Sequence, residues 1–153
     1  MKFKFKLESY LNVKKQTEEN IKNKLGKEML IAVKEENVLN TLQNETEELC
    51  KDIKRISSEG ITVAELNIYN TYMDFVVNKV KAQKEIVKKQ WEYVDELRCE
   101  LNKVLQERKI LEKYREKKFY EFLQMQLKEE SKLTDQLVSY KHAVGISEDN
   151  GTD

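Results

Sequence analysis

The sequence is poor in the residues that reverse the direction of a chain. It has no proline, and its 153 residues include only four glycines: Gly26, Gly60, Gly145 and Gly151. Compact domains build their many turns largely from glycine and proline. The composition therefore disfavours a compact, multi-turn fold and favours a few long helices.

Residues that usually build catalytic or metal sites are also scarce. The chain contains one histidine, His142, and two cysteines, Cys50 and Cys99. Metal sites need several converging ligands, and a phosphate-binding loop needs clustered glycines. Carboxylates are abundant, but they lack the pocket that acid–base chemistry requires. We therefore expect no enzyme, metal, cofactor or small-molecule substrate, and a solvated, inert His142.

Charge is abundant and evenly balanced. Charged residues make up 37% of the chain, with 28 basic and 28 acidic residues. A dedicated nucleic-acid binder is usually basic overall, so no nucleic-acid partner is expected. No run approaches the ~20 apolar residues of a membrane span, and "MKFKFKLESYL" lacks the apolar core of a signal peptide. These features predict a cytoplasmic protein with reduced cysteines.

The first third of the chain carries a heptad pattern. Alternating steps of four and three residues give fifteen positions, of which ten are apolar. They are Leu7, Leu11, Lys14, Glu18, Ile21, Leu25, Glu28, Ala32, Glu35, Leu39, Leu42, Thr46, Leu49, Ile53 and Ile56. A seam of about seven heptads is typical of a coiled coil, and its polar positions can fix register or partner.

A second seam follows a turn at "SSEGITVAEL". Gly60 suits a helix end, and Thr62 with Glu65 has the spacing of a capping box for the next helix. The second seam has ten apolar positions among its first twelve: Leu66, Tyr69, Met73, Val76, Val80, Gln83, Val87, Gln90, Val94, Leu97, Leu101 and Val104. It then weakens through Arg108, Leu111, Arg115 and Lys118, and a displaced stripe resumes with other apolar residues: Phe119, Leu123, Leu133, Leu137 and Tyr140.

The short turn predicts an all-α antiparallel coiled-coil hairpin over residues 1–142. We expect helices at about 3–57 and 62–141, joined by a turn at 58–61, and a disordered acidic tail at 143–153. The second helix should overhang the first by about twenty residues, roughly 30 Å. The pairing also places Cys50 and Cys99 roughly 40 Å apart, which excludes an intramolecular disulfide.

Two local features stand out from this scaffold. At the open end of the hairpin, the lysines of "MKFKFKLESYL" lie opposite "ERKILEKYREKK" (residues 107–118), which has six basic and three acidic residues. Helix pairs such as Arg108–Glu112 explain exposed charges there, but they explain cations on the seam less well. Just after the turn, Tyr72, Phe75 and Val77 exceed what one seam can cover, which leaves a docking face or self-association open.

Three segments together resemble the flagellar FliJ family. They are "KFKFKLESYLNVKK", "GIT…LNIYNTYMDFV" and "ERKILEKYREKKFYEF", in that order, within a resemblance that covers about residues 1–140. The resemblance implies a non-enzymatic antiparallel coiled coil of the flagellar type III export apparatus. Its implied partners are the hexameric export ATPase, the cytoplasmic part of the export-gate membrane protein, and export chaperones. The implied location is the cytoplasm, at the inner face of the membrane.

The resemblance also implies two groups of site residues. The ATPase would be bound by Lys4, Lys6, Arg108, Lys109, Arg115 and Lys118 at the open end. The export gate would be touched by a stripe matching Tyr72, Val76, Lys79 and Gln83, to which the surplus aromatic surface adds Phe75. Lys79 and Gln83 depart from the residue types that the family has there.

Two alternatives remain open at this stage. One is a homodimeric structural coiled coil whose seams pair between chains. The other is a nucleic-acid binder that uses the basic end. A monomeric mass in solution would favour the export component, and a dimer that does not depend on concentration would favour the homodimeric scaffold. A steep loss of affinity with salt would mark nucleic-acid binding.

Overall fold

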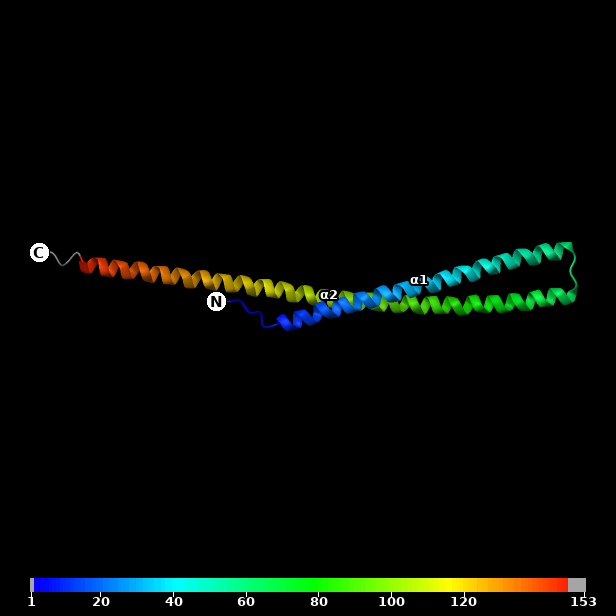
Figure 1. The fold of residues 1–153 in the computed structure, drawn as a ribbon, viewed down its shortest axis with the longest axis horizontal. Helices are drawn as coiled ribbons and strands as arrows, with labels where there is room; N and C mark the ends of the chain where they lie inside the picture. The colour runs from blue at the N-terminus through cyan, green and yellow to red at the C-terminus, as the bar shows by residue number, and fades with distance from the viewer. Residues whose placement is uncertain (1, 149–153) are drawn as a thin grey trace. The chain divides into compact units, whose positions relative to one another are not determined.

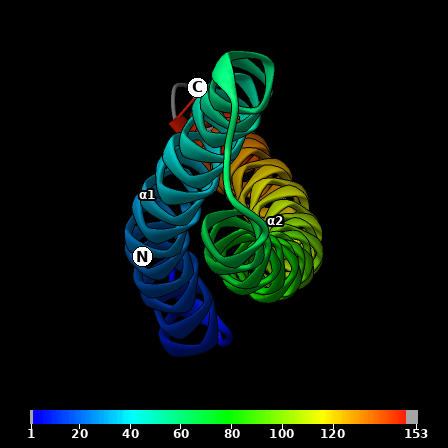
Figure 2. The same ribbon diagram turned by 90° about the vertical axis from the view of Figure 1, so that its right-hand side faces the viewer.

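The computed structural model describes residues 2–148, and the side chains of 2–145. It contains two helices, α1 (Glu8–Glu59) and α2 (Val63–Glu148), and no strand within the described range. Figure 1 shows the two helices running back from a short connection, and Figure 2 looks onto that connection. The expected all-α fold of two antiparallel, mutually packed helices is confirmed.

The chain divides into two compact units, and each contains part of both helices. Unit 1 joins the N-terminal residues, up to Lys15, to α2 from Gln106 onward. Unit 2 spans Gln16–Leu105 and includes the turn between the helices. Both units pack helix against helix along a single stripe.

The seam of unit 2 follows the predicted heptad positions. The buried apolar residues of this unit are Ile21, Ala32, Val76, Val94, Leu97 and Val104, and every one is a predicted seam position. Burial of such a side chain stabilises the folded state, by about 1.5–3 kcal/mol for a fully buried valine or leucine. The heptad pattern therefore identified the interface between α1 and α2 correctly.

Two polar rungs cross this seam. The Gln83 Nε2 donates to the main-chain carbonyl of Glu35 at 3.0 Å and to its Oε2 at 2.6 Å. Gln90 repeats the arrangement with Glu28, at 3.2 and 2.7 Å. A slipped register would leave these part-buried amides and carboxylates without partners, so the rungs favour one alignment.

The connection between the helices has the predicted turn chemistry. Gly60 has φ of 101°, a backbone conformation that disfavours any side chain. The N–H of Thr62 donates to Glu65 Oε2 at 3.0 Å, and the N–H of Glu65 donates to Thr62 Oγ1 at 3.3 Å. This is the expected capping box, in which each side chain satisfies a main-chain donor of the first turn of α2.

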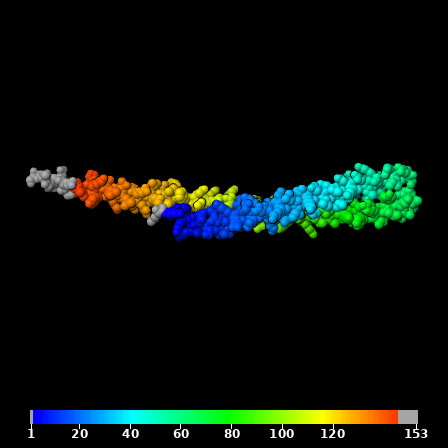
Figure 3. Space-filling view, in the orientation of Figure 1, coloured from blue at the N-terminus to red at the C-terminus, as the bar shows by residue number. Residues whose placement is uncertain are grey.

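The N-terminus differs from the expected fraying helix. Residues 2–5 have no helical structure, and α1 begins at Glu8 rather than at about residue 3. Phe3 and Phe5 are half-buried, whereas the lysines between and beside them are exposed. The alternation of lysine and phenylalanine is thus typical of an extended segment in which the phenylalanines pack on one side and the lysines face solvent. The space-filling view shows this segment lying against α2 (Figure 3).

The C-terminal part of α2 is longer than expected. The helix continues to Glu148, past the predicted end at about residue 141, and residues 149–153 of the expected tail lie outside the described range. The displaced apolar stripe is on the surface in this structure: Phe119, Leu123, Leu133, Leu137 and Tyr140 are all exposed. His142 is exposed as well, in agreement with the prediction.

Exchanging glycine for alanine should have opposite effects at two positions. Gly60→Ala should lower the free energy of unfolding by about 1–2 kcal/mol, because alanine is disfavoured at positive φ. Gly26→Ala is the matched control, since Gly26 lies inside α1 with open space around it. It should raise the free energy of unfolding by about 0.5–1 kcal/mol. Urea unfolding followed by circular dichroism measures both, and equal effects would contradict the turn described here.

The capping box should make the start of α2 sensitive to acid. Hydrogen bonds from the main-chain N–H and the hydroxyl of Thr62 lower the pKa of Glu65. The stabilisation is therefore present above the ordinary glutamate pKa and is lost as the pH falls through the lowered value. Amide hydrogen exchange at residues 62–66 should accelerate, relative to the rest of α2, on acidification through this range. Glu65→Gln should abolish that pH dependence, and an unchanged profile would show that the carboxylate does not cap the helix.

Candidate protein-binding surfaces

The described part of the chain presents two long helices rather than a cluster of potential metal ligands. No group of three or more histidine, cysteine or acidic side chains among these residues could hold a metal ion. Cys50 and Cys99 are free and exposed. Neither helix, over the range searched, has a segment long and apolar enough to cross a membrane. Two exposed surfaces contain the binding residues that were predicted from the sequence.

The first surface lies in unit 1 and is organised by aromatic packing. The Phe3 ring packs against Phe119 with a centroid distance of 5.2 Å, and against Phe122 at 5.6 Å. The Phe5 ring lies 5.9 Å from that of Tyr114. Edge and tilted contacts of this kind stabilise beyond simple burial. They anchor the extended N-terminal segment on α2 and so place the lysines of that segment next to the basic stretch of α2.

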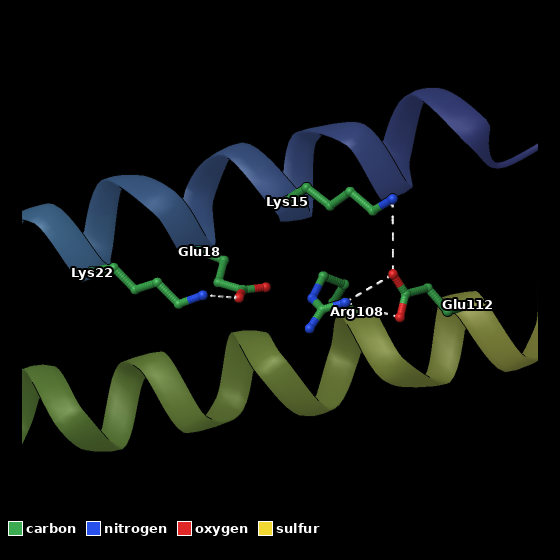
Figure 4. Close-up of polar contacts among 5 residues, drawn as sticks. All are labelled: Lys15, Glu18, Lys22, Arg108 and Glu112. Carbon is green, nitrogen blue, oxygen red and sulfur yellow. Dashed lines mark hydrogen bonds and ion pairs between the residues drawn. The ribbon is translucent and has the colours of Figure 1, made fainter.

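Glu112 neutralises one of the seam cations. Arg108 Nη1 donates to both of its carboxylate oxygens, at 2.8 and 2.9 Å, and Lys15 of α1 approaches from the other side at 3.8 Å. Figure 4 shows the Glu112 carboxylate between Lys15 and Arg108, and it also draws the Glu18–Lys22 pair of α1. The expected Arg108–Glu112 pair is thus present, and its acceptor also links α2 to α1 within unit 1.

The other two seam cations have carboxylate partners as well. Arg115 Nε lies 3.0 Å from Glu8 at the start of α1, which is a second link between the helices. Lys118 donates to Glu121 at 2.7 Å, and this hydrogen bond raises the pKa of Lys118 and lowers that of Glu121. Lys14 pairs with Glu107 in the same unit, which raises the pKa of the lysine. Charge on this part of the seam is therefore balanced by facing or neighbouring carboxylates.

Three of the six predicted cations remain available to a partner. Lys4, Lys6 and Lys109 are exposed, and none forms an ion pair with the residues that the structure describes. The six predicted residues therefore divide by role. Arg108, Arg115 and Lys118 have carboxylate partners within the unit, and Lys4, Lys6 and Lys109 form the open positive surface.

The second surface is an exposed aromatic patch on α2 in unit 2. The rings of Tyr72 and Phe75 lie 6.4 Å apart, and Lys79 Nζ lies 4.7 Å from the Phe75 centroid. Both rings are more than half exposed, at 53% and 54%. Ile68, one turn before Tyr72, is 69% exposed and lines the same shallow hollow. Ile68, Tyr72, Phe75 and Lys79 follow helical spacing and share one face, which we call the aromatic patch.

The other two residues of the predicted stripe have a different environment. Val76 is 5% exposed and Gln83 is 9% exposed, because both lie on the seam against α1. Gln83 also forms one of the polar rungs described above. The structure thus gives Val76 and Gln83 packing and register roles, and their contact with a partner stays a prediction.

Sequence reasoning missed several residues of these surfaces. Ile68 precedes Tyr72 by four residues, so helical spacing alone could have added it to the aromatic patch. Glu8 had no such signal, because its pairing with Arg115 depends on where α1 begins. Tyr114 and Phe122 were missed because the N-terminal segment was expected to be helical, which gave Phe3 and Phe5 no defined neighbours.

Comparison with known proteins agrees with this architecture. A family model described as "Flagellar FliJ protein" matches residues 3–145, nearly the whole chain. Comparisons with curated proteins and with solved structures gave no match. Because the family match spans far more than half of the sequence, the chain belongs to the FliJ family, whose members are structural components of the flagellar export apparatus.

Proposed function

We propose that this protein is a non-enzymatic, stalk-like coiled coil that couples the parts of the flagellar export machinery. It binds and activates the hexameric export ATPase, contacts the export gate, and escorts export chaperones. It works in the cytoplasm, at the inner face of the membrane. Family membership supports a place in the flagellar export apparatus. Two separate binding sites are proposed because the two exposed surfaces lie in different units of the chain.

The open positive surface of unit 1 is the proposed ATPase-binding site. Lys4 and Lys6 project from a segment that Phe3 and Phe5 anchor, and Lys109 follows Arg108 on α2. An anchored segment presents its charges with less loss of conformational freedom on binding than a free one does. Complementary charge on the ATPase ring would speed encounter and set orientation. Arg115 contributes by joining α2 to Glu8 of α1, whereas Arg108 and Lys118 bind carboxylates of α2 itself.

The aromatic patch of unit 2 is the proposed contact with the export gate. Exposed aromatic residues on a helix face are the type of residue that dominates binding energy at protein interfaces. Lys79 lies over Phe75 and adds a positive rim. We assign direct contact to Tyr72, Phe75 and Lys79, together with Ile68, and a supporting role to Val76 and Gln83 beneath them.

The exposed stripe of α2 after Lys118 is the proposed surface for a helical partner. Leu123, Leu133, Leu137 and Tyr140 are exposed at helical spacing. Export chaperones, which the family resemblance implies as partners, are assigned to this part of α2. The seam of unit 2 is already filled within one chain, which supports the hairpin over the alternative of a homodimeric scaffold paired through the same seams.

Reversing the unpaired charges should separate binding from folding. Lys4→Glu with Lys6→Glu should weaken binding to the export ATPase of the same organism by about tenfold or more, because both charges are open to a partner. Stimulation of ATP hydrolysis and ring formation should fall in parallel, with the melting temperature unchanged. Binding is measured by titration calorimetry, hydrolysis by phosphate release, and rings by electron microscopy.

Two comparison variants sharpen this test. Lys27→Glu with Lys34→Glu makes the same charge change on exposed residues of α1 in unit 2, and should leave ATPase binding intact. Arg108→Glu places a second carboxylate beside Glu112 and should lower the free energy of unfolding on the order of 1 kcal/mol. If wild-type protein neither binds nor stimulates the ATPase, the coupling proposal fails.

Removing the aromatic patch should spare the ATPase and affect the gate. Tyr72→Ala with Phe75→Ala should reduce binding to the cytoplasmic part of the gate protein by tenfold or more, about 1.4 kcal/mol. The hairpin should keep its helix content, because both side chains are exposed. Surface plasmon resonance measures gate binding, and circular dichroism measures folding. Equal loss of gate and ATPase binding, or loss of helix content, would assign these aromatics to packing instead.

A further inference from the structure

A groove between α1 and α2 in unit 2 lies outside the surfaces described above. It has a volume of about 970 Å³, and Val77 and Val80 of α2 are half-buried in its lining. Asn40, Asn44 and Thr46 of α1 add polar groups to its wall. A groove beside a two-helix seam is the place where a third helix can pack against both others.

Four lysines line this groove. Lys51 and Lys54 come from α1, and Lys81 and Lys84 come from α2. All four are exposed, and none forms an ion pair within the described residues. The groove has only one acidic residue in its lining, Glu47. Like charges held close together repel one another, so an acidic occupant would be favoured here.

A matching acidic row lies on α2 of the same unit. Glu92, Glu96 and Glu100 are spaced four residues apart, so they follow one another along one side of the helix. All three are exposed, and none has an ion-pair partner within 4 Å in the described part of the chain. The row spans two helical turns, about 12 Å, which is short enough to lie along the groove.

We propose that the lysine groove of one copy binds the acidic row of a second copy of this chain. The two surfaces are complementary in charge, and neither forms an ion pair among the described residues. Every copy of the chain carries one of each. The contact is heterologous, because it joins two different surfaces. It uses surfaces other than those of the ATPase and gate contacts proposed above.

Each surface also contains one free cysteine. Cys50 lines the lysine groove, and Cys99 lies within the acidic row between Glu96 and Glu100. When the row of one copy enters the groove of another, Cys99 of the first approaches Cys50 of the second. The two thiols therefore report on this contact without any engineered residue.

The first experiment measures association with charge-swapped variants. Wild-type mass in sedimentation equilibrium should rise above the monomer at about 0.05 M salt and return to it at about 0.5 M, where screening is strong. Lys51→Glu with Lys81→Glu should lower the association constant about tenfold or more, and Glu92→Lys with Glu96→Lys should do the same. An equimolar mixture of the two variants should recover association. The lysine-to-glutamate variant keeps its acidic row, and the glutamate-to-lysine variant keeps the lysine groove that binds this row.

The control pair and the contrary outcomes complete this test. Lys27→Glu with Lys34→Glu makes the same charge change outside the groove and should leave association unchanged. A wild-type protein that stays monomeric at low salt overturns the proposal and leaves the groove to another acidic partner or to none. Association that survives both charge swaps overturns it as well, because a different surface must then be responsible.

The second experiment uses a short bis-maleimide cross-linker on a mixture of ¹⁴N- and ¹⁵N-labelled protein at low salt. Mass spectrometry should find Cys50 linked to Cys99 in mixed-isotope pairs, which only an intermolecular contact can give. High salt, or Lys51→Glu with Lys81→Glu, should suppress these links. Links between two Cys50 residues or between two Cys99 residues, in place of the mixed pair, would overturn the proposed arrangement.

Discussion

A two-helix hairpin can bury only one stripe of each helix, and this constraint governs the rest of the structure. In unit 2 that stripe is nearly continuous, from Ile21 to Val104, and it must be filled and aligned by few residues. Apolar burial supplies the stability but specifies register weakly, because heptads resemble one another. The Gln83–Glu35 and Gln90–Glu28 rungs supply the missing specificity at a small cost in burial.

The periodicity of the sequence predicted this stripe well because a heptad pattern reports directly on burial. The turn was predicted equally well, since Gly60, Thr62 and Glu65 act through local geometry. The N-terminus was predicted less well, because the conformation of residues 2–5 depends on aromatic partners more than a hundred positions away. Local sequence contains no information about such contacts until the register of the hairpin is known.

The cations on the seam also depend on contacts that local sequence does not reveal. Arg108 and Arg115 look misplaced when the helix is read alone, because a packed helix normally places apolar residues there. Their partners Glu112 and Glu8 make both positions consistent with packing in unit 1. An exposed or partly exposed ion pair contributes little stability. The Arg115–Glu8 and Lys15–Glu112 links between the helices therefore favour a particular pairing more than they strengthen it. The predicted cations of unit 1 are therefore of two kinds. Some have carboxylate partners, and the exposed lysines Lys4, Lys6 and Lys109 form no ion pair with the described residues.

The same constraint explains where partner surfaces can form. A residue buried on the seam has little surface left for a partner, and burial distinguishes Val76 and Gln83 from the exposed Tyr72 and Phe75. The aromatic patch lies one residue before the seam at each step, with Ile68 beside Tyr69 and Phe75 beside Val76, so it runs alongside the seam on the exposed side of α2. A flank position is exposed to partners, yet the well-packed seam beneath holds its backbone in place. Binding surfaces on this protein are therefore expected on the flanks of the seam, where exposure and rigidity coincide.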